Sequence, residues 1–584
     1  MVDLAREKDL PPAHRLYTSH VEAGSEGSVA EELWGRIPAT LGEAYMLLAG
    51  VRKSYGPGSE NLEELKKIVK DNLRRLGILT SRVSENIDRL DRGAIEAGQQ
   101  PNALGGPSLV LNKIAFIKSL SNLGRERYTP LFYVADYDSV QAELINARVP
   151  SPSPRGLLLS YPVPPELEGS PIHELPNPPE AWLRKTIEKL KSNYRGLLRE
   201  AEPGLRERSL LNLDHALTVL RATYHSTENV SDWSTKTLGT LVNLEADLGV
   251  PIMTFSATGT SQLFQGSFEL LLAEPNRTKF LNASNRAVDI VEGAGYRPGI
   301  GPRDEEYVPF YFECPTLWCH RTRIELKYRR DPGSSTARIA GKCPKCGETH
   351  EFSINPGSPD LTEIIDMISP RVDSRQIIVD SVIPVLAHAG GPGETSYYPE
   401  IIPAARALGL PFPVYLRYNR LFYNTLWNET YAQSLKGKGY PTLTDDDLFK
   451  ALSGWVVARN QGDAHGLKAA HIQLRRMIEE TNEKLVERLD GLRLEVEAIK
   501  QSLRDPEKRD SLIQEMGGKQ ALAQEIETYL SSALGRFSPE KFGQEVSWAW
   551  LDVAVVAGLG DLMGVFLRQY NRNTPNSSVF FTNL

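Results

Sequence analysis

The sequence predicts an α/β fold organised around a parallel sheet. Two separated blocks each contain a glycine-rich turn, a helical pattern and a short apolar run, at 98–135 and at 390–417. Helices that alternate with short buried strands are typical of parallel sheets. The 584 residues are 41% hydrophobic and 24% charged, which is an ordinary globular composition with room for several domains.

The N-terminal block supplies the first elements. Apolar residues recur at helical spacing within 41–92, and a glycine-rich turn follows at 98–107. We expect a helix over 108–123 and then a buried strand over 130–135, which ends in Asp136-Tyr137-Asp138. Many prolines within 148–180 predict a connector rather than a packed element. The pattern is again helical over 180–245, and residues 251–256 fit another strand.

The four cysteines form two close pairs, Cys314-x4-Cys319 and Cys343-x2-Cys346. Four thiolates at this spacing suit a tetrahedral Zn²⁺ ion. Two disulfides are the alternative, which fits poorly with a cytoplasmic chain. His320 and His350 lie beside the pairs and could replace a cysteine, but four sulfurs are enough. A site closed by four sulfurs has no open coordination position, so we expect a structural zinc ion held in a ribbon of strands.

The second α/β block and a helical arm follow the cysteines. We expect a helix after the turn at 390–394 and a strand over 412–417. Residues 467–504 predict a long amphipathic helix that ends at Asp505-Pro506, and a second helix from about 511 to 534 returns antiparallel. The first helix carries a coiled-coil seam, which either closes an internal hairpin or joins two copies in a homodimer, the assembly we expect. The seam consists of Leu474, Ile478, Leu485, Leu489, Leu492, Val496, Ile499 and Leu503.

These patterns divide the chain into six segments. The α/β core is expected in two parts, 1–165 and 355–460. Between them lie a helical connecting region, 166–307, and the zinc ribbon, 308–354. The antiparallel coiled-coil arm takes 461–535, and a C-terminal helical segment takes 536–584, where the apolar stretch 548–555 predicts a buried helix.

Charge and hydropathy exclude several classes of protein. The formal net charge is -7, so general binding of polyanions is not expected, although a local basic groove is compatible with it. No apolar run of about 18 residues occurs, and the N-terminus lacks the apolar core of a signal peptide. We therefore expect a cytoplasmic protein that does not span a membrane.

The two glycine-rich turns are the candidate binding elements, because ligands of open α/β sheets bind beyond the carboxyl ends of the strands. Backbone N–H groups at 105–108 and 391–394 could bind a carboxylate or a phosphate, and Lys113 could neutralise a phosphate. Asp138 and Glu394 could hold an amine or a cation. Tyr397 and Tyr398 could contact a substrate, and His388 sits beside the second turn. Each of these residues has a structural alternative as a cap, a packed side chain or a solvated charge.

Taken together, these motifs resemble those of a known family. The first set is Gly98-Gln99-Gln100, Gly106-Pro107, Lys113 and the strand 130–135. The second is Ser369-Pro370-Arg371-Val372, Asp380, Pro384, Gly390-Gly391-Pro392-Gly393-Glu394, Tyr397-Tyr398 and Gly409-Leu410-Pro411-Phe412-Pro413. In this order they resemble the bacillithiol-biosynthesis cysteine-adding enzymes (BshC) over about 95–145 and 366–417. The chain is thus identified as a divergent member with an added zinc ribbon.

The resemblance implies a Rossmann-type core related to class I aminoacyl-tRNA synthetases, with a connecting insertion and a coiled-coil arm used for dimerisation. It implies a ligase that joins the carboxylate of an amino acid, cysteine by analogy, to the amine of a small acceptor such as a malyl-glucosamine-type sugar. It also implies binding of substrate or nucleotide at the motif residues Gly98, Gln99, Gln100, Gly106, Lys113, Gly391, Gly393, Tyr397 and Tyr398, with ATP or ADP as the candidate nucleotide.

The sequence differs from the family pattern at the expected catalytic residues. The family carries an acidic-histidine cluster after its strand, and here the aligned residues are Tyr137, Asp138, Ser139 and Val140, with Glu143 retained. The family histidine has no counterpart, and His388 could replace it in space. The expected catalytic set is therefore Asp138, Glu143, His388 and Glu394.

The alternative function is that of a non-catalytic relative that binds RNA or a protein through the zinc ribbon and the coiled coil. It depends on the basic edge of the ribbon, formed by Arg321, Arg323, Lys327, Arg329, Arg330, Lys342 and Lys345. Salt-sensitive binding of RNA would favour this reading, and binding of a nucleotide or an amino acid at the glycine-rich turns would favour the ligase.

Overall fold

A parallel five-stranded sheet is the centre of the protein in its computed structural model, which describes residues 10–23, 28–152, 156–330, 333–444, 464–503, 508–530 and 549–584 and a few residues between 446 and 457. The strand order is β12-β11-β1-β2-β5, and each neighbouring pair is parallel. The strands are β1 (Ala94–Gln99), β2 (Thr129–Val134), β5 (Ile252–Thr254), β11 (Val385–Gly390) and β12 (Val414–Arg417). This confirms the predicted α/β class.

The middle strand, β1, was not predicted from the sequence, and neither was its neighbour β11. Gly98 and Gln99 were placed in a turn, but they are the last two residues of β1 and pair with Tyr133 and Val134 of β2. The sequence Ala-Ile-Glu-Ala-Gly-Gln has few β-branched residues and no alternation, so it lacks the signal of a strand. Its residues are buried on both faces, because a central strand of a parallel sheet is covered on both sides, and such a strand needs no alternation of polar and apolar residues.

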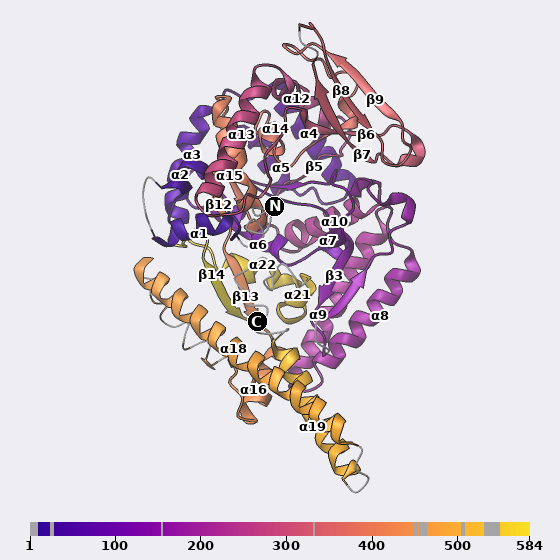
Figure 1. The fold of residues 1–584 in the computed structure, drawn as a ribbon, viewed down its shortest axis with the longest axis vertical. Coiled ribbons are helices and arrows are strands. Elements are labelled where there is room, and N and C mark those ends of the chain that lie inside the picture. The colour runs from indigo at the N-terminus through magenta and orange to yellow at the C-terminus, as the bar shows by residue number, and fades with distance from the viewer. Residues whose placement is uncertain are drawn as a thin grey trace.

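Helices cover the sheet and connect its strands (Figure 1). Helix α6 (Leu109–Ser121) links β1 to β2, packs against both and is covered on its outer side by α22 (Leu559–Leu567), so nearly all its residues are buried. Helix α15 (Pro392–Ala407) links β11 to β12. The others near the sheet are α3 (Leu41–Ser54), α4 (Glu60–Arg75) and α5 (Ser81–Asp88).

The cysteines belong to a second, antiparallel sheet with the order β10-β6-β7-β8-β9, at the top of Figure 1. Its strands are β6 (Tyr307–Glu313), β7 (Arg323–Arg329), β8 (Ala337–Lys342), β9 (Thr349–Ile354) and β10 (Ile368–Pro370). Strand β7 alternates buried and exposed residues, as its sequence predicts. Strand β10 returns the chain to the core through α14 (Arg375–Asp380).

The remaining helices lie around this frame. Helix α1 (His14–Ala23) packs with α2 (Val29–Trp34) on α15. The proline-rich connector holds the short strands β3 (Asn146–Val149) and β4 (Leu157–Ser160). The middle of the chain forms α7 (Ala142–Ile145), α8 (Glu180–Leu197), α9 (Pro203–His225), α10 (Val230–Gly239), α11 (Thr260–Leu263), α12 (Gln265–Leu272) and α13 (Asn276–Gly293).

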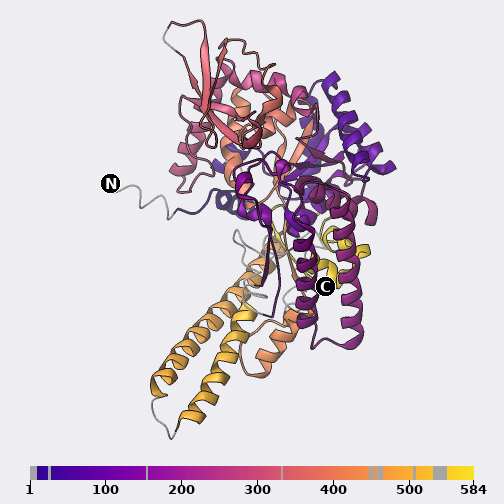
Figure 2. The ribbon, with the colours of Figure 1, turned by 90° about the vertical axis from the view of Figure 1, so that its right-hand side faces the viewer.

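A pair of long helices projects from the body of the protein (Figure 2). Helices α18 (Ala464–Ser502) and α19 (Arg509–Tyr529) run antiparallel, and their base packs on α16 (Leu426–Gly437). Seam residues Ile478, Leu485, Leu489 and Leu492 are buried with Ile526 and Tyr529 inside the same chain. The seam therefore closes an internal hairpin, and the homodimer stays a prediction. The side chain of Leu474 and residues 505–506 lie outside the described residues.

The C-terminal segment returns to the core. Helix α21 (Leu551–Ala557) covers most of the apolar stretch in which we expected a buried helix, and Trp548 lies outside the described residues. The final strand β14 (Val579–Asn583) pairs in parallel with β13 (Arg420–Asn424). Among the residues that the structure describes, no helix has the length and apolarity needed to cross a membrane.

Candidate active site

A cavity of about 710 Å³ opens at the carboxyl ends of β1 and β11, between the two glycine-rich turns. This is where ligands of open α/β sheets bind. Its lining includes Gly98, Gln99, Gln100, Gly106, Lys113, Gly391, Gly393, Glu394 and Tyr397, all of which we singled out from the sequence. The topology thus brings the two blocks together in one cavity, although their motifs are almost 300 residues apart in the chain.

An ion pair joins the two blocks inside this cavity. The Nζ atom of Lys113 lies 2.6 Å from Oε2 of Glu394, and their side chains are 2% and 15% exposed. Lys113 also donates hydrogen bonds to the carbonyl of Gly98 at 2.8 Å and to Oε1 of Gln99 at 3.1 Å. Burial alone would raise the pKa of Glu394, but the ammonium of Lys113 and the ring of His388 outweigh it and hold that pKa well below its usual range. Glu394 is therefore ionised at neutral pH.

The turn amides are less available than their sequence indicates. The N–H groups of Gly105 and Gly106 donate to the carbonyls of Asn102 and Ala103. The N–H of Gly391 donates to Oε2 of Glu394 at 2.6 Å. These three predicted donors therefore already have partners within the chain, and the cationic side chains of the cavity lining are those of Lys113, Arg148 and Arg375.

A buried polar layer lies behind Glu394 and not on the cavity wall. His388 is 1% exposed, and its two ring nitrogens each lie 3.7 Å from a carboxylate, Nε2 from Glu394 and Nδ1 from Glu96. Burial lowers the pKa of His388, but the two carboxylates outweigh it and raise that pKa above its ordinary value. Its ring stacks on Tyr398, with 4.9 Å between the ring centroids. His388 and Tyr398 were both predicted at the site, but both are buried behind the residues that line the cavity.

Of the other members of this layer, Glu96 and Gln376 were not singled out from the sequence, and Asp380 was quoted only as a motif residue. The amide of Gln376 donates to Glu96 at 2.9 Å and to Asp380 at 2.8 Å, and its oxygen accepts from the hydroxyl of Tyr398. Burial beside Glu96 raises the pKa of Asp380 well above its usual range. Arg375 was also missed. It lines the cavity and donates to the hydroxyl of Tyr397 at 3.2 Å. Both Gln376 and Arg375 belong to α14, a helix of six residues that is too short to show a helical pattern.

Asp138 lies at the carboxyl end of β2, as expected, but it does not line the cavity. Its carboxylate accepts from Nε2 of Gln100 at 3.0 Å and pairs with Arg323 of β7 at 3.1 Å. An arginine of the cysteine-bearing sheet thus neutralises a predicted catalytic residue. Glu143 lies in α7, and its side chain is outside the described residues.

The four cysteines come together at one end of the antiparallel sheet. Their Sγ atoms lie within 4.8 Å of one another, with 3.8 Å between Cys314 and Cys346 and between Cys319 and Cys343. Four sulfurs at 2.3 Å from a tetrahedral Zn²⁺ ion stand about 3.8 Å apart, so the donor set fits zinc. Nε2 of His350 lies 3.7 Å from Sγ of Cys314, beside the cluster.

The basic edge of the ribbon is largely neutralised within the chain. Arg321 pairs with Glu313, and Lys327 and Arg329 both pair with Glu306. Lys345 donates to the carbonyl of Glu166 and to the hydroxyl of Ser170, so it docks the ribbon on the connector. These pairings weaken the case for a phosphate-binding ribbon, and the RNA-binding alternative stays a prediction.

Comparison with known proteins agrees with the motifs. Over 358 residues the chain is 24% identical to "Putative cysteine ligase BshC" of Desulforamulus reducens. The chain is similar to this cysteine ligase. The match covers 58% of the chain and 57% of the relative, so the chain spans little more than half of that protein's length. The resemblance to the BshC proteins is confirmed at this divergent level of identity. No family model matches the chain.

Proposed function

We propose that the protein is a ligase that forms an amide between an amino acid, cysteine, and the amine of a small acceptor of the malyl-glucosamine type. The observation that carries the proposal is the Lys113–Glu394 pair in the wall of a cavity at the carboxyl ends of the strands. The name of the relative, a cysteine ligase, supports the class of reaction.

An amino acid in water is a zwitterion, with a carboxylate and an ammonium a few ångströms apart. A cation and an anion side by side in one cavity are complementary to it. The substrate would open their ion pair, so that Lys113 takes the carboxylate in place of Glu394, and Glu394 takes the ammonium. Because the pKa of Glu394 is held low, this side chain is a poor base. Its proposed role is to bind and orient the substrate.

Amide formation also requires activation of the carboxylate. We propose ATP as the co-reactant, which transfers a phosphoryl or a nucleotidyl group to one carboxylate oxygen. The acceptor nitrogen then forms the C–N bond, the activated C–O bond breaks, and the oxygen leaves with phosphate or AMP. The acceptor ammonium first loses one proton to solvent, so that its nitrogen has the lone pair that attacks, and it loses a second proton to solvent once the C–N bond has formed. Lys113 and Arg375 line the cavity and would neutralise the charge of the transferred group.

The test is a reaction of the zinc-loaded protein with cysteine, malyl-glucosamine and ATP, followed by mass spectrometry of the product and by chromatography of ADP and AMP. We expect a product with the mass of the amide, and its loss in Lys113→Met. Arg125→Gln changes the charge of an exposed residue outside the cavity and should keep the activity. Failure of the wild-type protein to form any amide from cysteine would refute the proposal.

A further inference from the structure

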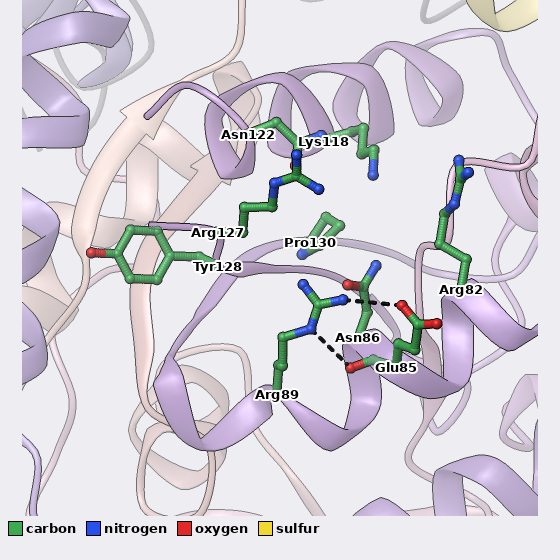
Figure 3. Close-up of a pocket in the computed structure, with 9 residues that line it drawn as sticks. All are labelled: Arg82, Glu85, Asn86, Arg89, Lys118, Asn122, Arg127, Tyr128 and Pro130. Atoms are coloured by element: carbon green, nitrogen blue, oxygen red, sulfur yellow. Dashed lines mark hydrogen bonds and ion pairs between the residues drawn. The ribbon is translucent and has the colours of Figure 1, made fainter. Parts of the chain in front are cut away.

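A second cavity, of about 520 Å³, is lined by the residues drawn in Figure 3. It is lined by residues of α5, of the last turn of α6 and of the segment that leads into β2. The candidate active site lies at the carboxyl ends of the strands, whereas Pro130 places this cavity at the amino end of β2. Helix α6 reaches both, because it carries Lys113 in the first cavity and Lys118 in the second.

Positive charge dominates the lining of this second cavity. Its charged residues are Arg82, Arg89, Lys118 and Arg127 against Glu85, four cations and one anion, for a net charge of +3. Arg89 pairs with Glu85 at 3.4 Å, and Arg82 pairs with Asp247, which is outside the lining, at 3.1 Å. Lys118 and Arg127 have no carboxylate within ion-pair distance among the residues that the structure describes.

Lys118 is partly buried in this cavity beside the three arginines of the lining. Burial, together with Arg82, Arg127 and Arg89, lowers the pKa of Lys118 to about 8, and Asp247 opposes this effect only in part. In Figure 3, the side chains of Lys118 and Arg127 lie on one side of the cavity and that of Arg89 lies on the other. Lys118 and Arg127 are thus the two cations of this lining that an anion could reach without displacing a carboxylate of the described residues.

We propose that this cavity binds the phosphate group of a small ligand as a dianion, at a site separate from the candidate active site. Two cations without carboxylate partners match the charge of a phosphate monoester, and the guanidinium of Arg127 offers it a fork of two N–H donors. The concave shape and the volume favour a small molecule over a polymer. The proposal does not depend on the ligase function.

Calorimetry of the full chain at constant ionic strength tests the proposal. Inorganic phosphate, pyrophosphate and ADP are the probes, and acetate is the singly charged control. We expect phosphate to bind, and Lys118→Gln and Arg127→Gln each to weaken it by about tenfold or more, as for the loss of a charge-assisted hydrogen bond. Arg125→Gln is the matched control, because Arg125 lies two residues from Arg127 and outside the cavity. Lys113→Met should leave the binding of inorganic phosphate unchanged, which separates this cavity from the first one, where ATP is proposed to bind. Whether phosphate, pyrophosphate or ADP binds tightest identifies the source of the group.

A second readout is competitive acetylation of lysines at pH 8, followed by mass spectrometry. We expect Lys118 to react faster than exposed lysines, and phosphate to suppress its reaction by keeping the amine protonated. The proposal is overturned if none of the three probes binds, or if Arg125→Gln weakens binding as much as Arg127→Gln. Preference for an RNA oligomer over every small phosphate would overturn it too.

Discussion

The Lys113–Glu394 pair gives the sharpest test of the site's energetics. Replacing Lys113 with Met removes the ammonium and leaves a buried carboxylate that still holds the N–H of Gly391. Removal of one partner from a buried pair lowers the free energy of unfolding by about 3–5 kcal/mol. Because Glu394 still accepts the N–H of Gly391, we expect a loss near the lower value. Glu394→Gln should cost about 2 kcal/mol, because Lys113 keeps its bonds to Gly98 and Gln99.

A double-mutant cycle isolates the interaction. If the two residues act as a pair, Lys113→Met/Glu394→Gln should lose about 2 kcal/mol less than the sum of the single losses. The assay is urea unfolding, with hydrogen exchange of the amides in β1 and α6 as the local readout. A coupling free energy below about 0.5 kcal/mol would refute the reasoning.

The same pair predicts a pH dependence. The pKa of Glu394 is depressed in the folded protein, so its contribution to stability is present above the unfolded pKa, near 4.5, and is lost as the pH falls towards the folded value. Lys113→Met should flatten this acid limb of the stability curve. An unchanged acid limb in Lys113→Met would contradict the assigned cause of the shift.

Three further predictions concern other parts of the protein. The carboxylate of Glu400 accepts the N–H groups of Gly299 and Ile300, and burial raises its pKa to about 7, so stability should fall as the pH rises from about 4.5 to 7. Glu400→Gln should therefore raise the free energy of unfolding at pH 8 by up to about 3 kcal/mol, and a loss at pH 8 would contradict this. Gly106 has φ +81°, and an added Cβ would lie 2.9 Å from Oδ1 of Asn102, so Gly106→Ala should cost about 1–3 kcal/mol in urea unfolding. A Cβ added at Gly393 meets no atom within 4 Å, so Gly393→Ala should leave the free energy of unfolding nearly unchanged. Equal losses in Gly106→Ala and Gly393→Ala would contradict the argument from the positive φ of Gly106. Chelation should remove one Zn²⁺ per chain. Hydrogen exchange should then become faster in the amides of β6 to β9, while those of β1 and β2 stay protected. If the metal-free protein kept the same protection in β6 to β9, a structural role of the ion would be excluded.

Elements with a strong local pattern could be predicted from the sequence. The strand expected at 130–135 is β2 and the helix expected at 108–123 is α6, each within two residues at either end. The cysteine spacing likewise predicted the four-sulfur cluster. These features depend on periodicity or spacing within a few turns of chain, which a sequence displays directly.

The elements that were missed depend on tertiary context. Strand β1 is specified by burial on both faces rather than by alternation, and Arg375 and Gln376 lie in a helix of six residues, which is too short to show a helical pattern. Lys113 and Glu394 were each singled out, but their contact comes from the pairing of β1 with β11. That Asp138 is paired with Arg323 follows from the packing of the two sheets, which no local pattern indicates.

Binding of cysteine to the purified, zinc-loaded protein tests the central claim most directly. Calorimetry should show one site per chain, lost in both Lys113→Met and Glu394→Gln and kept in Arg125→Gln, because the first two variants each remove one charge that complements the zwitterion. Binding of cysteine with the same affinity in all three variants would place the amino acid elsewhere and contradict the account of this cavity.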